Sequence, residues 1–173
     1  VLQDITEQKR AEDAYRTLVE QSPAGISIWQ NSRIVFTNQA AEQLTGYSRD
    51  ELIALSAGEL VEIVHPEDRW ALGHFENRLR GEPIPTSYEL RLIHKTGAVR
   101  WVSRNARGIQ FQGNPAVQVM DMDITTHKQM EQELIRLERL RVAGELSAGV
   151  SHNLNNILTG VLLPAQMLQV SLQ

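Results

Sequence analysis

The stretch from about residue 88 to residue 111 alternates between apolar and polar side chains with a period of two. Its apolar members are Tyr88, Leu90, Leu92, Val99, Trp101, Ile109 and Phe111. Turn-forming sequences at 95–97 and 112–114 interrupt the stretch, and an apolar run follows at 117–120. Because this period is typical of a β-strand that buries one face, we predict three consecutive antiparallel strands.

Two shorter β-rich runs come earlier, at 25–29 and 33–37. The polar segment Gln30-Asn31-Ser32 separates them, which predicts a β-hairpin. Short helices are predicted next, at 38–45, 48–64 and 67–80, with breaks at Gly46, Gly58 and Pro66. Two strands, several helices and three strands predict an α+β fold, with a five-stranded antiparallel sheet and helices on one face.

The beginning of the chain has a helical pattern over about 4–21, so we expect a linker helix at 1–21. Its segment Asp4-Ile5-Thr6-Glu7-Gln8-Lys9 is echoed by Asp123-Ile124-Thr125-Thr126-His127-Lys128. Such an echo is expected where one module follows another of the same kind. Since the chain starts without Met and stops within a helical pattern at Gln173, we expect a piece of a larger protein.

The composition narrows the class of protein. With 173 residues the chain can form one ordinary domain with helical arms. Its net charge of −4 is spread along the sequence, so we expect neither a nucleic-acid partner nor contact with a membrane. We expect a cytoplasmic segment, because no apolar run is long enough to span a bilayer and no signal peptide is recognisable. The absence of cysteine excludes disulfides, thiolate zinc sites and a cysteinyl-flavin adduct.

The sequence from 126 to 141 has the pattern of a coiled-coil linker. Met130, Leu134 and Leu137 follow a 4-3 spacing, which suits two parallel helices. A short exposed amphipathic helix is the alternative. If the coil forms, a rotation or shift of the helix pair can alter access to the segment that follows.

A histidine is the notable feature of the last segment, 142–173. Its apolar residues fall on one arc of a helix, namely Ala143, Leu146, Val150, Leu154, Ile157, Leu158, Val161 and Leu168. His152 projects from the opposite side, and Asn156 lies one turn further on. The spacing alone allows either a solvated surface histidine or a reactive group.

Several motifs, spread over about 14–125, resemble those of PAS domains. They are the segments Asn38 to Tyr47, His65-Pro66-Glu67-Asp68-Arg69, Tyr88-Glu89-Leu90-Arg91, Lys95-Thr96-Gly97 and Asp123-Ile124-Thr125. The resemblance implies a PAS domain with its C-terminal PAC motif at 22–125. It also assigns Asp123 and Thr125, in the closing motif, to signal transmission.

Many PAS domains hold a small ligand between sheet and helices. The candidates here are Ile26, Ile28, Phe36, Leu44, Leu60, Phe75, Leu90 and Trp101. The alternative is that they are simply core residues, as any half-buried sheet requires. The ligand is unknown. We do not expect haem, because His74 is out of register with the iron ligand of haem-sensing relatives, and we expect no metal site.

The segment Gly144 to Asn156 resembles the phosphoacceptor box of sensor histidine kinases of bacterial two-component systems, in a variant with a paired Asn155-Asn156. The resemblance implies that 142–173 is the first helix of a dimerising bundle. His152 would attack the γ-phosphate of ATP, which a downstream kinase domain presents with magnesium, and would pass the phosphoryl group to an Asp of a response-regulator receiver domain. A neutral imidazole suits this step, because one ring nitrogen is nucleophilic near neutral pH.

Two asparagines qualify this resemblance. Most members have an acid directly after the histidine, whereas this chain has Asn153, which can accept a hydrogen bond but cannot take a proton. Asn156 stands where the family often uses Thr or Asn to orient the water that dephosphorylates the regulator. General-base catalysis beside His152 is therefore in question.

The sequence predicts the sensor and phosphoacceptor part of a histidine kinase, which forms a homodimer through its helices and PAS domain. It contains no Gly-rich nucleotide motif, so we do not expect this piece to bind ATP alone. One alternative is a PAS interaction module on a coiled coil, with a non-kinase output and an incidental His152. An oxygen-binding haem protein is the other.

Overall fold

The computed structural model describes residues 10, 14 and 16–144. The chain divides after Thr126 into two compact units. Residues 16–20 are helical, and most of the expected linker helix at 1–21 lies outside the described residues. The predicted phosphoacceptor site also lies outside them, so its members stay predictions: His152, Asn153 and Asn156.

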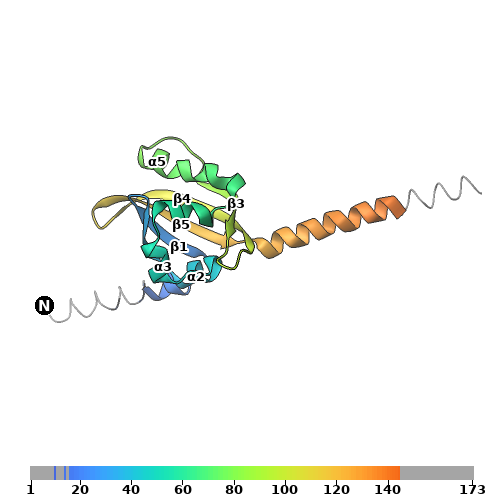
Figure 1. Ribbon diagram of the computed structural model, residues 1–173, viewed down its shortest axis with the longest axis horizontal. Coiled ribbons are helices and arrows are strands. Elements are labelled where there is room, and N and C mark those ends of the chain that lie inside the picture. Colours follow the sequence, from blue (N-terminus) through green and yellow to red (C-terminus); the bar gives the residue numbers. More distant parts are fainter. Residues whose placement is uncertain (1–9, 11–13, 15, 145–173) are drawn as a thin grey trace, which may run out of the picture. The chain divides into compact units, whose positions relative to one another are not determined.

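The first unit contains an antiparallel sheet, to which its described residues contribute five strands (Figure 1). They are β1 (Gly25–Gln30), β2 (Arg33–Thr37), β3 (Ser87–Ile93), β4 (Val99–Phe111) and β5 (Asn114–Asp123). Their spatial order is β2-β1-β5-β4-β3, so the last strand of the chain lies beside the first. The predicted sheet is confirmed. β5 is longer than the apolar run at 117–120, because it pairs with β4 along its whole length.

The β1–β2 hairpin turns at Asn31 and Ser32, whose φ angles are 50° and 59°. Two-residue hairpin loops need positive φ, because only then does the turn match the right-handed twist of the strands. Asparagine adopts this conformation more readily than most residues. Gln30 pairs with Arg33 across the turn, as the predicted hairpin requires.

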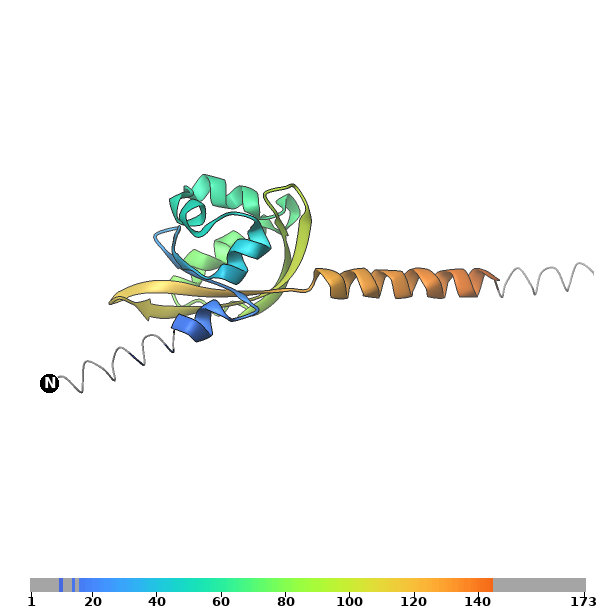
Figure 2. The same cartoon turned by 90° about the horizontal axis from the view of Figure 1, so that it is seen from below.

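Short helices cover one face of the sheet (Figure 2). They are α2 (Gln39–Thr45), α3 (Arg49–Ala54), α4 (Ala57–Ile63), the 3-10 helix η1 (Pro66–Leu72) and α5 (Gly73–Leu79). Figure 2 shows them above the strands, with residues 16–20 (blue) below. Helices are thus found in the regions where the sequence predicted them.

One break between helices differs from the prediction. Gly58 was expected to end a helix, but it lies inside α4, and the break falls at Leu55 and Ser56. The Ser56 hydroxyl accepts a hydrogen bond from the Glu59 backbone N–H at 3.3 Å, and the Glu59 carboxylate accepts one from the Ser56 N–H at 2.8 Å. This capping box starts a new helix, whereas glycine within an exposed helix only weakens it.

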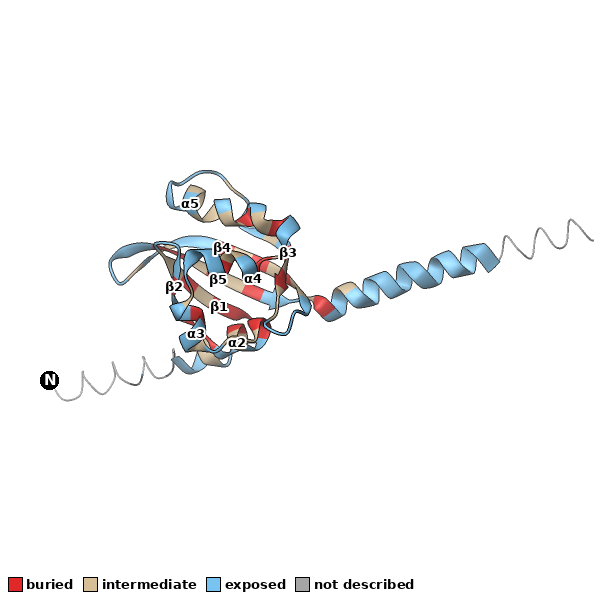
Figure 3. Cartoon of the chain, in the orientation of Figure 1, coloured by how far each residue is buried: buried red, intermediate tan, exposed pale blue. Residues whose placement is uncertain are grey.

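The helices and the sheet enclose an apolar core (Figure 3). Its buried members are Ile34, Leu44, Leu52, Leu60, Ile63, Val64, Ala71, Leu90, Leu92 and Val102. Burial of a leucine-sized side chain contributes about 1.5–3 kcal/mol, so this layer of contacts is the main force that holds the helices on the sheet.

A single buried asparagine joins three segments. Asn38, at the N-cap of α2, is fully buried. Its Oδ1 accepts hydrogen bonds from the backbone N–H groups of Ile26 at 2.8 Å and Ala41 at 3.2 Å. Its Nδ2 donates to the carbonyls of Val19 at 2.9 Å and Ala24 at 3.0 Å. These bonds fix α2 to β1 and to the helical residues 16–20.

An ion pair fixes η1 to β3. The Asp68 side chain, which is largely buried, accepts hydrogen bonds of 2.7 to 2.9 Å from the backbone N–H and the guanidinium of Arg91. Glu67 accepts another from the same guanidinium at 2.8 Å. The hydrogen bonds from Arg91 lower the pKa of Asp68 below its ordinary value.

In the second unit, the described residues continue a helix that spans 125–144. Its large exposed apolar side chains are Met130, Leu134, Ile135, Leu137, Leu140 and Val142. A coiled coil needs a second chain, so the coil at 126–141 stays a prediction. Within the part of the chain that the structure describes, none of the helices has both the length and the apolar character needed to cross a bilayer.

The lowered pKa of Asp68 predicts how stability depends on pH. A carboxyl group whose pKa is lower in the folded than in the unfolded chain stabilises the fold above its unfolded pKa, about 3.9, and this is lost as the pH falls through the folded pKa. Replacing Asp68 by Asn should cost about 1–3 kcal/mol near neutral pH and progressively less toward pH ~2. Urea denaturation of both proteins between pH 7 and about pH 2 measures this difference in the free energy of unfolding.

The matched control is Asp50→Asn, since Asp50 is an exposed acid in the first turn of α3. Its effect on the free energy of unfolding should be small. A gap between wild type and Asp68→Asn that stays constant down to about pH 2 would contradict the assigned role of Asp68.

Candidate functional site

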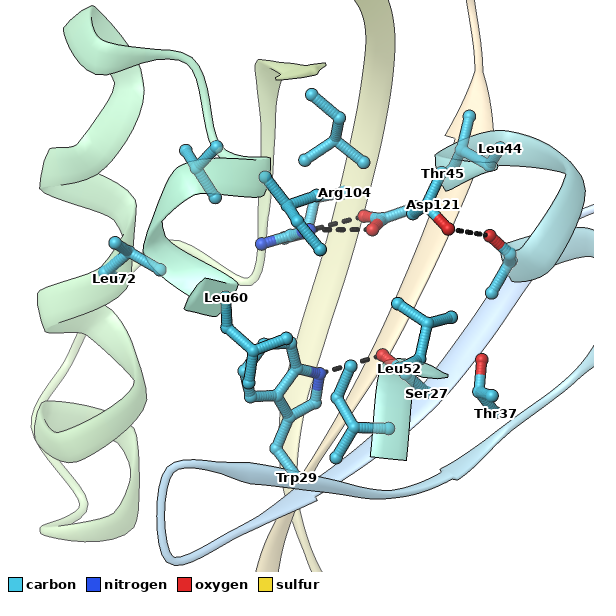
Figure 4. Close-up of a pocket in the computed structure, with 16 residues that line it drawn as sticks. Ser27, Trp29, Thr37, Leu44, Thr45, Leu52, Leu60, Leu72, Arg104 and Asp121 are labelled. Carbon is cyan, nitrogen blue, oxygen red and sulfur yellow. Dashed lines mark hydrogen bonds and ion pairs between the residues drawn. The ribbon is translucent and has the colours of Figure 1, made fainter. Parts of the chain in front are cut away.

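An internal cavity of about 40 Å³ lies between the sheet and the helices (Figure 4). Most of its lining is apolar and comes from α2, α3, α4, η1 and the inner face of the strands. The hydroxyl and charged side chains of the lining are Ser27, Thr37, Thr45, Arg104 and Asp121. One water requires roughly 10–15 Å³ of such volume, so the cavity as it stands holds a few waters or a very small ligand.

Arg104 and Asp121 form a buried ion pair in the cavity wall. Nε and Nη2 of Arg104 donate to the two carboxylate oxygens of Asp121, each at 2.7 Å (Figure 4). The two side chains are 5% and 10% exposed. Burial alone would lower the pKa of Arg104, but the charge of Asp121 and its hydrogen bonds raise it above the ordinary value. The pair is therefore ionised, and the wall carries no net charge.

The hydroxyl of Thr37 is the unusual polar group of the cavity. Thr37 is fully buried, and its Oγ1 has no hydrogen-bond partner among the described residues. Ser27 lies opposite Thr37 in the β1–β2 pairing, but its Oγ accepts a hydrogen bond from the indole N–H of Trp29 at 2.8 Å. Since a buried hydroxyl is normally paired, the unpaired hydroxyl makes Thr37 a candidate for contact with a ligand.

The eight predicted ligand contacts are dispersed. Leu44 and Leu60 line the cavity. Phe75 lines a separate hollow beside it, and Leu90 belongs to the adjoining core. The other four do not line the cavity: Ile26, Ile28, Phe36 and Trp101. Contact with a ligand stays a prediction for all eight residues.

Strand register explains the misplaced residues of the hairpin. The cavity lining takes Gly25, Ser27 and Trp29 from β1, and successive side chains on a strand point to opposite faces. Ile26 and Ile28 therefore face away from the cavity. Phe36 pairs with Ile28 across the hairpin and shares its face.

On β4 the predicted alternation is one residue out of phase. Val102, Arg104 and Ala106 are the buried residues, so the inner face carries an arginine. Trp101 lies on the outer face, where the Arg91 guanidinium is 5.1 Å from its ring centre. The sequence does hold a signal for Arg104, because it has the same period-two phase as its two apolar neighbours.

His74, which was considered as a haem ligand and set aside, lies in α5 and is not part of the cavity lining. Its ring contacts Trp70 and Tyr88 edge-on, with ring centres 5.3 Å and 5.4 Å apart. Over the described residues, no three His, Asp or Glu side chains gather as a metal site requires. The identity of the ligand stays open.

The two residues predicted to transmit a signal fix the start of the helix at 125–144. The Asp123 carboxylate accepts a hydrogen bond from the Thr125 backbone N–H at 2.8 Å. The Thr125 hydroxyl in turn accepts one from the Trp101 backbone N–H at 3.0 Å. The first residue of the helix is thus attached to β4 through its side chain, while its role in signalling stays a prediction.

Known proteins resemble this chain in sequence and fold. A family model described as PAS fold matches residues 34–120. Sporulation kinase A of Bacillus subtilis (strain 168) is 27% identical, over 88% of this chain and 25% of its own length. Sensor histidine kinase TmoS of Ectopseudomonas mendocina is 28% identical, over 90% of this chain and 17% of its own length.

Among solved structures, the PAS domain of an HTR-like protein from Haloarcula marismortui has the same fold. It matches with a TM-score of 0.56 and 19% identity, over 72% of this chain and 100% of that domain. The chain spans a quarter or less of the two kinases.

Because the Thr37 hydroxyl is unpaired, we predict that removing it stabilises the fold, whereas most substitutions destabilise. Thr37→Val keeps the shape of the side chain and removes a buried group without a partner, so it should raise the free energy of unfolding by about 1 kcal/mol. Thr45→Val is the matched control, because the Thr45 hydroxyl donates to the Ala41 carbonyl at 2.8 Å and its loss should destabilise. Chemical denaturation compares the two. A clear destabilisation by Thr37→Val would show that its hydroxyl is well paired.

Proposed function

Because the chain belongs to the PAS family and its PAS domain is homologous to sensor histidine kinases, we propose that it is the sensory and phosphoacceptor region of such a kinase. The PAS domain receives a signal in or near its cavity. The helix that begins at Thr125 carries the signal onward. His152 then takes a phosphoryl group from ATP and gives it to an aspartate of a response-regulator receiver domain.

The observation that carries this proposal is the extent of the similarity. The PAS fold match covers residues 34–120, whereas the two kinases align with 88% and 90% of the chain. The kinase similarity therefore extends beyond the PAS domain. It supports a common arrangement of input domain and following helices, which is the arrangement a phosphoacceptor helix needs.

The proposed chemistry uses few groups. A ring nitrogen of His152 attacks the γ-phosphorus, the bond from that phosphorus to the bridging oxygen breaks, and ADP leaves. A neutral imidazole has this nucleophilic nitrogen near neutral pH. Asn153 can orient the ring by accepting a hydrogen bond, but the proton released must go elsewhere, because an amide does not take it. Asn156 is proposed to orient water in the reverse, phosphatase reaction.

The exposed stripe on the helix at 125–144 supports a homodimer. Met130, Leu134 and Leu137 are 62%, 68% and 53% exposed, and they follow the coiled-coil spacing. A soluble helix rarely leaves such a row in water, so a second copy of the chain is the proposed partner. The stripe would then align two copies of His152.

The contacts of Asp123 and Thr125 support a route for the signal. They attach the start of the helix to β4, which also carries Arg104 of the cavity wall. A change in the cavity that shifts β4 against β5 would therefore act on the first turn of the helix. Coupling of this kind has to be demonstrated by a measured response, since proximity alone does not establish it.

The second candidate function is a PAS module on a helical stalk with a non-kinase output. Asn153 favours it, because the usual acid beside the histidine is missing. The two functions share the PAS domain and the dimer. They differ in whether His152 is ever phosphorylated.

Phosphotransfer is tested in the longest natural protein that contains this chain. With ATP labelled at the γ-phosphate, we expect an acid-labile, base-stable label that His152→Gln abolishes, because the phosphoryl acceptor is lost. His127→Gln, an exposed histidine in the described helix, is the matched control and should keep the label. Label that persists in His152→Gln places the acceptor elsewhere. Lack of label in every variant favours the non-kinase function.

The signal route is tested at Thr125. Thr125→Val removes the hydroxyl that pairs with Trp101, so we expect a loss of about 1 kcal/mol in stability and an altered ratio of kinase to phosphatase activity. The exposed neighbour provides the control, because Thr126→Val should leave both quantities near wild type. Denaturation and phosphotransfer assays measure them. Normal regulation in a destabilised Thr125→Val protein would rule out this route.

A further inference from the structure

A second hollow lies directly outside the cavity, over α4, η1 and α5. Its volume is about 350 Å³, which falls in the range of about 300–1,000 Å³ that is typical of small-molecule sites. Ser32, Ala57, Gly73 and Glu76 of its lining are exposed, so it opens to solvent. Aromatic and aliphatic side chains form the rest of its wall.

Three side chains form the partition between this outer hollow and the inner cavity. Trp29, Leu60 and Leu72 line both. Trp29 is the largest, and its indole ring packs against Phe75 with ring centres 4.8 Å apart. Figure 4 shows Trp29 beside Leu60 at the edge of the cavity. Movement of the indole would join the two spaces.

A hydrogen bond holds Trp29 in place beside an unpaired hydroxyl. The indole N–H donates to Ser27, which directs the Ser27 hydroxyl toward the tryptophan. Ser27 is the cross-strand neighbour of Thr37, whose buried hydroxyl has no partner among the described residues. The Ser27 hydroxyl keeps a donor proton of its own, yet it makes no hydrogen bond to Thr37 in this arrangement, so the Thr37 hydroxyl is left for another partner.

From this arrangement we propose that the outer hollow and the cavity form one site for a small, uncharged, aromatic molecule with a single hydroxyl or similar group. The ring stacks against Trp29 and Phe75 in the outer hollow. The polar group passes the displaced indole and pairs with Thr37. This inference rests on the proposed function, because it names the ligand class of the sensor domain.

The charges around the site exclude other ligand classes. Arg104 and Asp121 already satisfy each other through two hydrogen bonds, so the inner cavity offers no free charge to an ionic group. Glu76 at the outer hollow already pairs with Arg80 at 3.6 Å, so it offers no free charge to an ionic ligand. The inner cavity admits a group of a few atoms only, whereas the outer hollow admits a ring.

The test uses benzyl alcohol and ethylbenzene as probes on the 173-residue chain. The two have nearly the same shape and differ by a hydroxyl in place of a methyl group. NMR titration gives their dissociation constants and reports on the indole N–H signals, with Trp29→Phe to assign Trp29. We expect benzyl alcohol to shift the Trp29 signal and to leave that of Trp70, which is exposed elsewhere, in place.

Two glycines provide a matched pair of blocking variants. Both are helical, and a Cβ at either meets no atom within 4 Å, so both should tolerate leucine. Gly73 lines the outer hollow and Gly58 does not. Gly73→Leu should weaken both probes by about tenfold or more, and Gly58→Leu by less than about twofold.

Thr37→Val tests the polar end of the site. It should weaken benzyl alcohol by about fivefold to tenfold and leave ethylbenzene within about twofold, because only the alcohol loses a hydrogen bond. Equal effects on both probes, unchanged binding in Gly73→Leu, or no shift of the Trp29 signal would each overturn the proposal. The NMR titration measures binding and does not depend on phosphotransfer. A failure of the proposed kinase function would therefore not affect the binding result, and a failure of binding would not affect the phosphotransfer result.

Discussion

The structure depends on one buried amide. Asn38 uses its oxygen for two backbone N–H groups and its nitrogen for two carbonyls, and it is fully buried while doing so. No other side chain of similar size offers both acceptor and donor in this geometry, because aspartate cannot donate and leucine can do neither. The amide fixes α2 to β1, and both elements contribute residues to the cavity lining. Burial of apolar side chains then packs the helices against the sheet around the cavity.

The fold was predictable because its signals are local. The period-two pattern and the turn sequences predicted the strands, and Asn31 in the hairpin loop has the left-handed conformation that such turns need. The capping box at Ser56 was present in the sequence, and weighing it above Gly58 would have placed the helix break correctly. Each of these features involves residues within a few positions of one another.

The cavity was harder to predict because its polar groups are paired over long range. Arg104 lies on the inner face of β4, where a pattern argument expects an apolar residue, and it is tolerated only because Asp121 neutralises it from the adjacent strand. Neither residue, taken alone in the sequence, indicates the ion pair. The predicted phase of β4 was based on Val99 and Trp101, which places Trp101 in the core and leaves Arg104 on the outer face. A shift of one residue in the apolar pattern thus changed the predicted lining.

The same two strands connect the cavity with the start of the helix at 125–144. Arg104 pairs with Asp121, and the next inward pair along the ladder is Val102 with Asp123, whose carboxylate binds the first residue of the helix. Ser27 of β1 pairs with Val119 on the same strand, β5. The Ser27 hydroxyl accepts a hydrogen bond from Trp29 and keeps one proton of its own, so it can serve two partners at once. A change in the cavity wall would act on these two hydrogen-bonded strands as a unit, because packed structures move between defined arrangements and do not deform continuously.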